Sequence, residues 1–314
     1  MNVNSIFSLL FAILLYSCYT SYMIHLEPKN YPKDFYYHRT ASATYREYLH
    51  SCGLTTFDID HAPQFAWKKK IFGNWFWVVK YERIDIEPDI EHIKRVTWLR
   101  HAFIAWIPYS LTDIPKPWRR LWMTDHFEET GYAQLVENGN TWTSESNPLS
   151  HLSSWNDRSK RAYKKYLASG ATIKYVTPEE YTSAFQKTKV KHWYKWAYIS
   201  YYNRMVKIDA SKIRQWLAYA PDGQIVWGLS VHDFCENHSV HLTAFTDVRY
   251  YDLQAGTGLI ERWFHDSYEK WYTYLSFDQL RNKNGPSDQK GYTAFKENFL
   301  TARLSFKKAF FRFF

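Results

Sequence analysis

The second half of the sequence, from about residue 155 to residue 300, carries a continuous series of helix and strand signals. The strongest is Thr177-Pro178-Glu179-Glu180, in which a threonine can cap a helix, proline fits the first position and a glutamate follows three residues after the cap. Asn156 or Asp157 can cap an earlier helix, and Gly170 stands where that helix would end. This alternation of helices and strands predicts an α/β domain.

The predicted elements follow the order helix, strand, helix, strand hairpin, strand, glycine loop, helix and strand. Pro221-Asp222-Gly223 is the tight turn of the hairpin, so its two strands are expected to be antiparallel. The predicted helices are 157–170, 178–191 and 259–272, and the predicted strands are 171–176, 213–220, 224–234, 239–246 and 274–277.

The first half of the sequence is patterned less regularly. It contains a short predicted helix at 41–49 and two apolar strand-like runs, Trp75–Tyr81 and His101–Tyr109. Between these runs, IEPDIEHIKRVTWLR is interpreted as a turn and the start of another strand, and the later IPKPW cannot be regular structure. We therefore predict a small α/β half over residues 25–135 and a larger domain over residues 136–314.

Residues 1–24 form a hydrophobic segment with three alternative roles: an anchor or signal, a buried core element, or a mis-assigned start. Ile6–Tyr16 is nearly all apolar, and a milder stretch extends it to Ile24, which just reaches the length that spans a bilayer. No Lys or Arg precedes it, so the positive start of a signal peptide is missing. Three widely spaced cysteines favour a reducing compartment. We expect a cytoplasmic protein, with membrane association through residues 6–24 as an option.

The formal net charge of +9 favours anionic partners such as nucleic acid, phosphorylated small molecules or an acidic membrane surface. The excess is local, because residues 158–207 contain twelve Lys or Arg against two acids, Glu179 and Glu180. Such a run is typical of a solvated helix face. The aromatic residues among these cations also fit a surface that contacts phosphate or RNA. An aromatic share of 20% likewise fits either an aromatic-rich core or a ligand-binding groove.

A glycine-bearing loop, Gly256-Thr257-Gly258, precedes the last long predicted helix. Glycines let a backbone approach a ligand closely, and the free N–H groups at a helix start favour a phosphate. A tight turn from strand to helix would use the same residues. The loop therefore indicates either a phosphate site or a structural turn.

Three histidines, His232, His238 and His241, lie close together in the sequence. Their spacing matches no metal signature, so structural roles or substrate contacts are expected, and no metal site is predicted. The sequence also lacks a GxSxG elbow and a defensible Cys–His pairing, which would indicate a covalent nucleophile. Direct transfer chemistry needs no such nucleophile.

The C-terminal half, from about Trp155 to Phe299, resembles the GNAT-like half of the FemAB-type family of peptidoglycan bridge aminoacyltransferases and related N-acyltransferases. Upstream, FIAWIPYSLTD is similar to a segment of the family's first, degenerate GNAT-like half. The resemblance implies a mixed, mainly antiparallel central sheet with flanking helices, preceded by a smaller half. The matching stretches are WNDRSKRAYKKYLASG, DGQIVWGLSV, AGTGLIERWFHDSYEKW, YLSFD and the closing GYTAFKENFL.

The resemblance also implies catalytic residues at the end of the chain. Phe295 and Lys296 match the family's Phe-Lys pair, and a lysine ammonium suits the oxyanion that forms when an amine attacks an acyl carbon. An ordinary surface lysine at a helix start is the alternative for Lys296. Asp278 follows an apolar run and could accept a proton from the attacking ammonium or orient it, or only pair with a nearby cation. Gly291 would let the loop pass close to substrate.

Binding residues are expected at two further places. In GNAT proteins the glycine loop holds the pyrophosphate of coenzyme A, but the family pattern has Arg or Gln where this sequence has Leu253. The first helix of the larger domain would help to hold an anionic partner. The residues expected to bind substrate or donor are Gly256, Thr257, Gly258, Gly291, Arg158, Arg161 and Lys165.

The sequence as a whole favours an N-acyltransferase that moves an acyl or aminoacyl group from acyl-CoA or aminoacyl-tRNA to an amine, with a cell-wall precursor as one candidate acceptor. No permanently bound cofactor is expected. The partners would be an anionic small molecule or a lipid-linked substrate, with tRNA as a further option. The alternatives are a non-catalytic GNAT-like binding protein and a basic RNA-binding module. The aromatic and basic tail, RLSFKKAFFRFF, is expected to be a closing strand or an interfacial segment.

Overall fold

The computed structural model describes most of the chain from Ser42 onward. The described residues are 42–60, 65–71, 76–82, 84, 86–108, 116–121, 129–135, 150–152, 155–188, 195–235, 237–280, 290–305 and 309–314. The hydrophobic segment at 1–24 lies outside them. Within the described ranges, no helix has the length and apolar character that a bilayer crossing requires.

The chain divides into two compact units that are not continuous in sequence. The first takes the chain up to Thr130 together with two later segments, Gln279–Lys290 and Arg303–Phe314. The second takes Gly131–Asp278 and Gly291–Ala302. The sequence had indicated two continuous segments, 25–135 and 136–314, whereas the chain passes back to the first unit twice.

The first unit is built on a six-stranded sheet with the order β1-β2-β3-β4-β13-β5. On one face of this sheet, Val79, Ile104 and Trp106 pack with Ile93 of a helix. The C-terminal strand β13 pairs with β4 and β5, which confirms the closing-strand alternative for the tail. The elements are α2 (Ala43–Ser51), β1 (Thr55–Asp58), β2 (Phe65–Ile71), β3 (Phe76–Glu82), α3 (Ile90–Thr97), β4 (Phe103–Ile107), β5 (Arg119–Arg120) and β13 (Phe310–Phe313).

The prediction for the segment between β3 and β4 was wrong. Helix α3 occupies the position where a turn and a strand were expected. Asp89 caps this helix by accepting a hydrogen bond from the Glu91 backbone N–H, and Trp98 ends it in the left-handed conformation with φ 58°. Ile93 and Thr97, four residues apart, are buried on one side, so the helical spacing was present in the sequence but was masked by its charges.

The second unit is built on a seven-stranded, mostly antiparallel sheet with the order β12-β6-β11-β10-β9-β8-β7. Its hairpin, its long strands and its helices confirm the predicted mixed α/β fold class. The strands are β6 (Glu129–Gln134), β7 (Thr172–Tyr175), β8 (Ile213–Tyr219), β9 (Ile225–Cys235), β10 (His238–Thr246), β11 (Tyr274–Leu280) and β12 (Ala302–Ser305). The helices are α4 (Asp157–Ala168), α5 (Pro178–Lys187), α6 (Lys195–Asp209), α7 (Ala255–Glu269) and α8 (Lys290–Lys296), and a 3-10 segment, η7 (Val248–Leu253), precedes α7.

The helix caps and the helix end that were predicted in the second half of the sequence are confirmed. Thr177 and Glu180 form the predicted capping box at the start of α5, with bonds of 3.2 and 2.8 Å. Asn156 caps α4, and Gly170 follows the end of α4 with φ +74°. Helix α6 has no counterpart among the predicted elements, because its sequence, KWAYISYYNRMVKID, carries no cap signal and mixes polar and aromatic residues.

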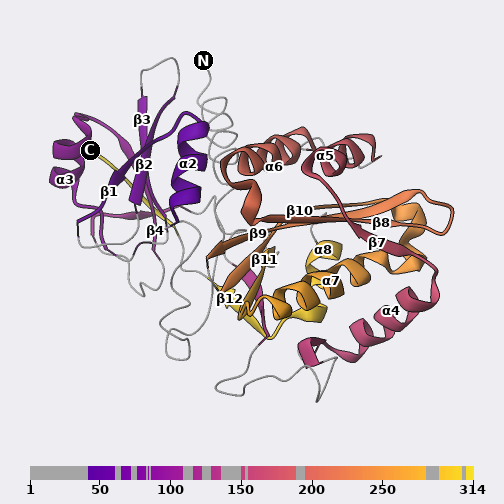
Figure 1. The fold of residues 1–314 in the computed structure, drawn as a ribbon. Helices are drawn as coiled ribbons and strands as arrows, with labels where there is room; N and C mark the ends of the chain where they lie inside the picture. The colour runs from indigo at the N-terminus through magenta and orange to yellow at the C-terminus, as the bar shows by residue number, and fades with distance from the viewer. Residues whose placement is uncertain are drawn as a thin grey trace. The chain divides into compact units, whose positions relative to one another are not determined.

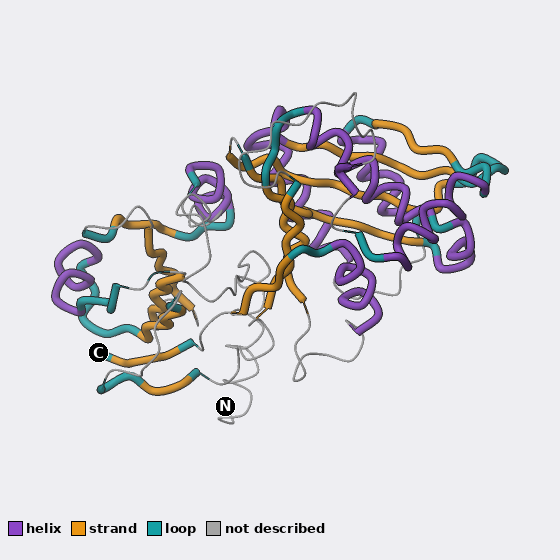
Figure 2. Tube along the Cα trace, turned by 90° about the horizontal axis from the view of Figure 1, so that it is seen from below, coloured by secondary structure: helices purple, strands orange, loops and turns teal. Residues whose placement is uncertain are grey.

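The helices of the second unit cover both faces of its sheet. Helices α4, α7 and α8 lie on one face, and α5 and α6 lie on the other (Figure 1). Figure 2 shows the long strands of this sheet running alongside one another, with helical segments over them. The main core lies between the sheet and α7, where Trp216, Leu229 and Val231 of the strands pack with Leu259 and Trp263 of the helix.

A buried ion pair lies within this core. Arg214 of β8 donates to both carboxylate oxygens of Asp233 on β9, each at 2.8 Å, and also to the Ser267 hydroxyl of α7 at 2.8 Å. The Ser239 hydroxyl accepts a hydrogen bond from the Trp263 indole at 2.9 Å and one from Arg214 at 3.3 Å. Because these hydrogen bonds link three strands and a helix, they fix the position of α7 on the sheet.

We expect Asp233→Ala to lower the free energy of unfolding by about 3–5 kcal/mol, because it leaves the Arg214 guanidinium buried without its carboxylate. Urea unfolding monitored by circular dichroism measures this loss. Glu91→Ala is the matched control, since it removes the exposed partner of Lys94 and should change stability by about 1 kcal/mol or less. Equal losses in the two variants would contradict a structural role for the buried pair.

Candidate functional site

Strands β10 and β11 run parallel for a short distance and then part. Beyond this stretch, β10 continues to Thr246 and β11 to Leu280. His241 is the next residue of β10, so it lies where the two strands part. The paired residues are His238 with Tyr274, Ser239 with Leu275 and Val240 with Ser276.

Helix α8 presents two different sides to the second unit. Tyr292 and Lys296 are four residues apart and therefore share one side of the helix. Phe295 faces the aromatic core instead, with its ring centroid 5.6 Å from that of Trp227 and 5.0 Å from that of Phe299. The two members of the Phe-Lys pair thus have different roles in the structure: Phe295 anchors the helix, and Lys296 faces the polar group described next.

A group of three side chains forms between α8 and β10. The Tyr292 hydroxyl lies 3.2 Å from Nε2 and 3.4 Å from Nδ1 of His241. The Lys296 ammonium lies over the ring of the same tyrosine, with Nζ 4.1 Å from the ring centroid. Tyr292 is 41% exposed, whereas His241 and Lys296 are 7% and 2% exposed. One exposed phenol therefore stands between solvent and two buried basic side chains.

The surroundings of His241 determine the protonation state of its imidazole. Burial, reinforced by the neighbouring Lys296 ammonium, holds the pKa of His241 well below its usual value, so the imidazole is neutral near pH 7. Burial alone lowers the pKa of the nearby His238 to about 4. A neutral imidazole can accept a proton from the tyrosine hydroxyl.

The burial of Lys296 argues against the surface-lysine alternative. A lysine nitrogen that is removed from water is unfavourable unless other groups compensate, and such side chains gather at functional sites. The sequence pointed to Lys296 but not to Tyr292, although the spacing of four residues on a short helix was a usable signal. In the sequence, His241 stands out only as one of three histidines that lie close together.

Two other predicted residues stand near this group in the sequence. Asp278 lies within β11, which runs three residues further than the predicted strand, and its side chain is outside the described part of the structure. Gly291 is exposed in the first turn of α8, and a Cβ added there would meet nothing within 4 Å. Among the described residues, none therefore requires a glycine at this position.

The predicted glycine loop is instead part of the first turn of α7, which begins at Ala255, and its residues are buried. A Cβ on Gly256 would lie 1.1 Å from the Trp227 ring, and one on Gly258 would lie 2.6 Å from the Tyr166 ring. Thr257 is 2% exposed, and its N–H donates to the Gln254 carbonyl at 2.9 Å. These glycines admit two aromatic rings beside the helix start, and any larger residue at either position would collide with a ring.

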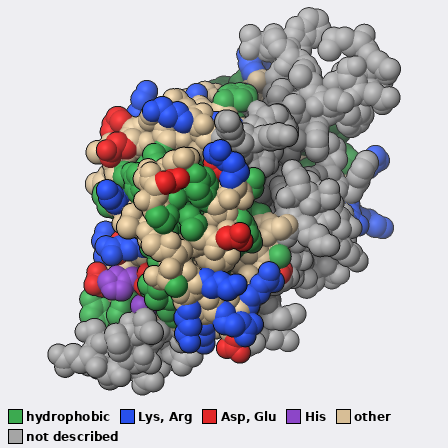
Figure 3. Space-filling view, turned by 90° about the vertical axis from the view of Figure 1, so that its right-hand side faces the viewer, with side chains coloured by type: hydrophobic (Ala, Val, Ile, Leu, Met, Phe, Trp, Pro, Cys, Tyr) green, Lys and Arg blue, Asp and Glu red, His purple; other side chains and the backbone are tan. Residues whose placement is uncertain are grey.

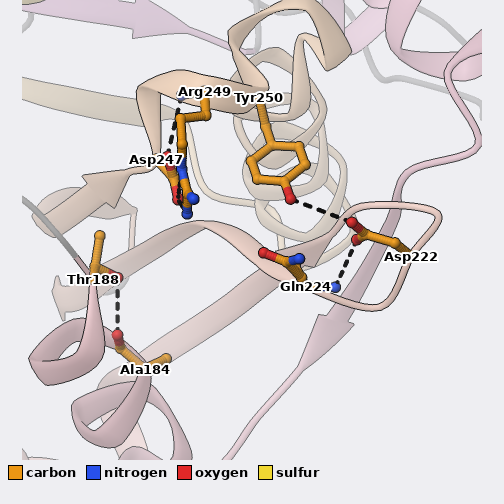
Figure 4. A network of polar contacts seen from close by, with 7 residues as sticks. All are labelled: Ala184, Thr188, Asp222, Gln224, Asp247, Arg249 and Tyr250. Atoms are coloured by element: carbon orange, nitrogen blue, oxygen red, sulfur yellow. Dashed lines mark hydrogen bonds and ion pairs between the residues drawn. The ribbon is translucent and has the colours of Figure 1, made fainter.

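The segment that leads into α7 is held by a polar network (Figure 4). The carboxylate of Asp222, in the turn between β8 and β9, accepts hydrogen bonds from the Gln224 backbone N–H at 3.0 Å and the Tyr250 hydroxyl at 3.2 Å. Asp247 caps η7 by accepting from the Arg249 backbone N–H at 3.1 Å. These bonds tie the start of α7 to the β8–β9 turn.

Arg158, Arg161 and Lys165 lie exposed on α4, which packs against α7. Figure 3 shows Lys and Arg side chains gathered over the lower part of the face on which α4 lies. These cations face solvent, while Lys296 is buried on α8. The structure therefore separates the predicted residues into a buried group at α8, a closed glycine turn at α7 and an exposed basic helix at α4.

Helix α7 carries one set of side chains with metal-ligating atoms close together. One ligand atom from each of His265, Asp266 and Glu269 lies within 4.8 Å of the others. Arg262 already pairs with Asp266 at 2.9 Å, which neutralises that carboxylate. The sequence-based expectation of no metal site stays a prediction.

Comparisons with known proteins place the fold. No protein-family model and no curated protein matches the sequence. The solved structure of FemX is similar over 86% of this chain and 90% of that chain, with a TM-score of 0.62 at 12% identity. A conserved protein of unknown function from Bacteroides thetaiotaomicron is similar over 88% of this chain and 91% of that chain, with a TM-score of 0.55 at 7% identity. The chain has a FemAB-type, GNAT-like fold.

Proposed function

We propose that the protein is an N-acyltransferase that moves an acyl or aminoacyl group from an activated donor to an amine. The observation that carries this proposal is the buried Lys296 ammonium, held beside Tyr292 and His241 where β10 and β11 part. When an amine attacks an ester or thioester, the carbonyl oxygen becomes negatively charged. A fixed cation in a water-poor site stabilises that charge more strongly than it would in water.

The donor that we favour is an aminoacyl ester carried by tRNA. The first support is the start of α7, where the rings of Trp227 and Tyr166 fill the space beside Gly256 and Gly258 that a coenzyme A pyrophosphate would need. The second is α4, whose exposed cations suit a phosphate backbone. Such a donor would place the reaction in the cytoplasm.

The acceptor in this proposal is a primary amine on an anionic or lipid-linked molecule, with a cell-wall precursor as the first candidate. This part rests on the resemblance of the closing GYTAFKENFL to the FemAB-type family and on the FemAB-type fold. The open space beside Gly291 is a route by which an amine could approach α8.

A thermal-shift titration of the full chain tests the proposal. Coenzyme A, acetyl-CoA, charged tRNA and a UDP-linked muropeptide are compared, because a ligand that binds the folded state raises the melting temperature. We expect shifts with charged tRNA and with the muropeptide, and none with coenzyme A. Labelled aminoacyl-tRNA and the muropeptide together should then yield an aminoacylated product.

A charge-reversal variant of α4 tests whether tRNA binds to that helix, separately from the site around Lys296. Reversing the charges of Arg158, Arg161 and Lys165 to Glu should remove the tRNA shift and leave the muropeptide shift intact. A coenzyme A shift would make the donor an acyl-CoA. Binding of tRNA without transfer to any amine would favour the RNA-binding alternative and count against catalysis.

A further inference from the structure

We propose that the C-terminal end of α3 docks the first unit on the surface of an anionic lipid bilayer. The indole of Trp98 enters the headgroup region, and the cations of Lys70 and Arg100 face the lipid phosphates. This surface shares no residue with the site around Lys296, so it does not depend on the proposed transfer reaction.

Trp98 is the most exposed large apolar side chain in the described part of the structure. It follows the last residue of α3 and is 91% exposed. An indole ring has a large apolar surface, and leaving it in water forgoes the free energy that its burial would contribute. A partner that covers this ring therefore gains affinity from it.

The backbone at Trp98 makes a tryptophan unfavourable there. The residue has the left-handed conformation with φ 58°, and its N–H donates to the Lys94 carbonyl at 2.9 Å. Glycine suits the residue that ends a helix in this way, because a side chain is crowded in the left-handed conformation. A bulky residue at such a position, with its ring in solvent, is expected where the side chain serves binding and not folding.

Two lysines of β2 lie beside this end of α3. The Lys68 ammonium donates to the Thr97 carbonyl at 3.0 Å, which places it next to the residue that precedes Trp98. Lys68 and Lys70 both lie over the ring of Trp77, with Nζ 5.3 and 5.0 Å from its centroid. Tryptophan rings and lysine ammonium groups therefore occur together on this part of the first unit.

The charge of this end of α3 complements an anionic surface. Two acids there already have basic partners, since Asp60 lies 3.5 Å from Arg95 and Glu91 lies 2.7 Å from Lys94. Arg100 is exposed two residues after Trp98. Each Lys or Arg held near an anionic leaflet adds to the attraction.

The apolar part of the surface favours a bilayer over a nucleic acid. Val96 is 39% exposed in the last turn of α3, close in the chain to Trp98. A nucleic acid base could stack on the indole but would gain little from an aliphatic side chain. An indole and an aliphatic group flanked by Lys and Arg are the combination that binds at the boundary between headgroups and acyl chains.

Substitution of Trp98 by glycine tests the surface without a risk to folding. We expect Trp98→Gly to lower the affinity of the full chain for lipid vesicles about tenfold, because the indole is gone. The vesicles are phosphatidylcholine with about one third phosphatidylglycerol, and sedimentation measures the bound protein. The same variant should raise the melting temperature by about 2–4 °C, because glycine adopts the left-handed conformation without crowding.

The second unit offers a matched control at Trp271. This residue follows α7, has φ 62° and is 68% exposed, but the last turn of its helix ends on the exposed acid Glu269. Trp271→Gly should raise the melting temperature in the same way and leave the vesicle affinity unchanged. A gain in stability together with a loss of binding is therefore expected at Trp98 alone.

The charges are tested separately. Lys70→Gln and Arg100→Gln should each lower the vesicle affinity about fivefold. These losses should become smaller at high ionic strength, because salt screens the attraction between the cations and the lipid phosphates. Vesicles of phosphatidylcholine alone should not distinguish these variants from wild type.

A fluorescent label reports directly whether Trp98 meets the lipid. Trp98→Cys and Trp271→Cys are labelled with a polarity-sensitive fluorophore, and the unsubstituted chain, labelled in the same way, corrects for the three native cysteines. The emission of the label at position 98 should shift to shorter wavelength when vesicles are added. The label at position 271 should show no shift.

Four results would overturn the proposal. Trp98→Gly could bind vesicles as tightly as wild type, or the two glycine variants could lose affinity equally, which would mean that the position on α3 is not what matters. The label at position 98 could stay in water while the protein sediments with vesicles, which would place the contact elsewhere in the chain. Trp98→Gly could weaken binding to RNA and not to vesicles, which would make the partner of this surface a nucleic acid.

Discussion

Lys296→Met is expected to lower kcat about 100- to 1000-fold while substrate binding is retained, because the variant removes the charge that stabilises the oxyanion. Lys296 is 2% exposed, and methionine is an apolar side chain of similar length, so it can fill the same space. The substitution should therefore not reduce thermal stability. Single-turnover transfer and a thermal melt of the same preparation measure the two quantities.

Lys270→Met, at the C-cap of α7, serves as the control for this prediction, since it removes the positive charge of an exposed lysine that lies outside α8 and β10. It should change neither the transfer rate nor the melting temperature. A Lys296→Met protein that is folded, binds substrate and turns over at the wild-type rate would contradict the oxyanion role. Equal losses of binding and rate would indicate that Lys296 holds the substrate in its ground state.

Gly256→Ala is expected to destabilise the second unit by about 1–3 kcal/mol or more, because the new methyl group would lie 1.1 Å from the Trp227 ring. That ring cannot move freely, since Trp227 also packs against the core and against Phe295. The midpoint of urea unfolding measures the loss. Gly291→Ala is the matched control, because a Cβ at that position meets nothing within 4 Å.

A second substitution tests the cause of this loss. Trp227→Ala alone should destabilise by about 3–5 kcal/mol through the cavity it leaves. The double variant, Gly256→Ala with Trp227→Ala, should be more stable than the sum of the single losses predicts, because the methyl group then has room. Additive losses would mean that the indole ring is not what requires the glycine.

The sequence predicted the start of α4, the capping box of α5 and the turn before β9, because a cap or a tight turn depends on residues only a few positions apart. It failed at α3 and α6. At α3 the apolar spacing was obscured by charges, and α6 carries no cap signal. The closing strand was foreseen, but its pairing with β4 and β5 in the other unit could not be, since local patterns do not encode which distant strand is the partner.

The candidate site shows the same difference between what local sequence patterns predict and what long-range packing decides. By itself the sequence determined the element order of the second half except for α6 and, through the family resemblance, pointed to Lys296. Only the tertiary structure buried that lysine, brought Tyr292 against a histidine fifty-one residues earlier in the chain, and closed the glycine turn with the ring of Trp227. The reason is physical: caps and turns form from neighbouring residues, whereas burial and long-range contacts depend on how the helices pack on the whole sheet.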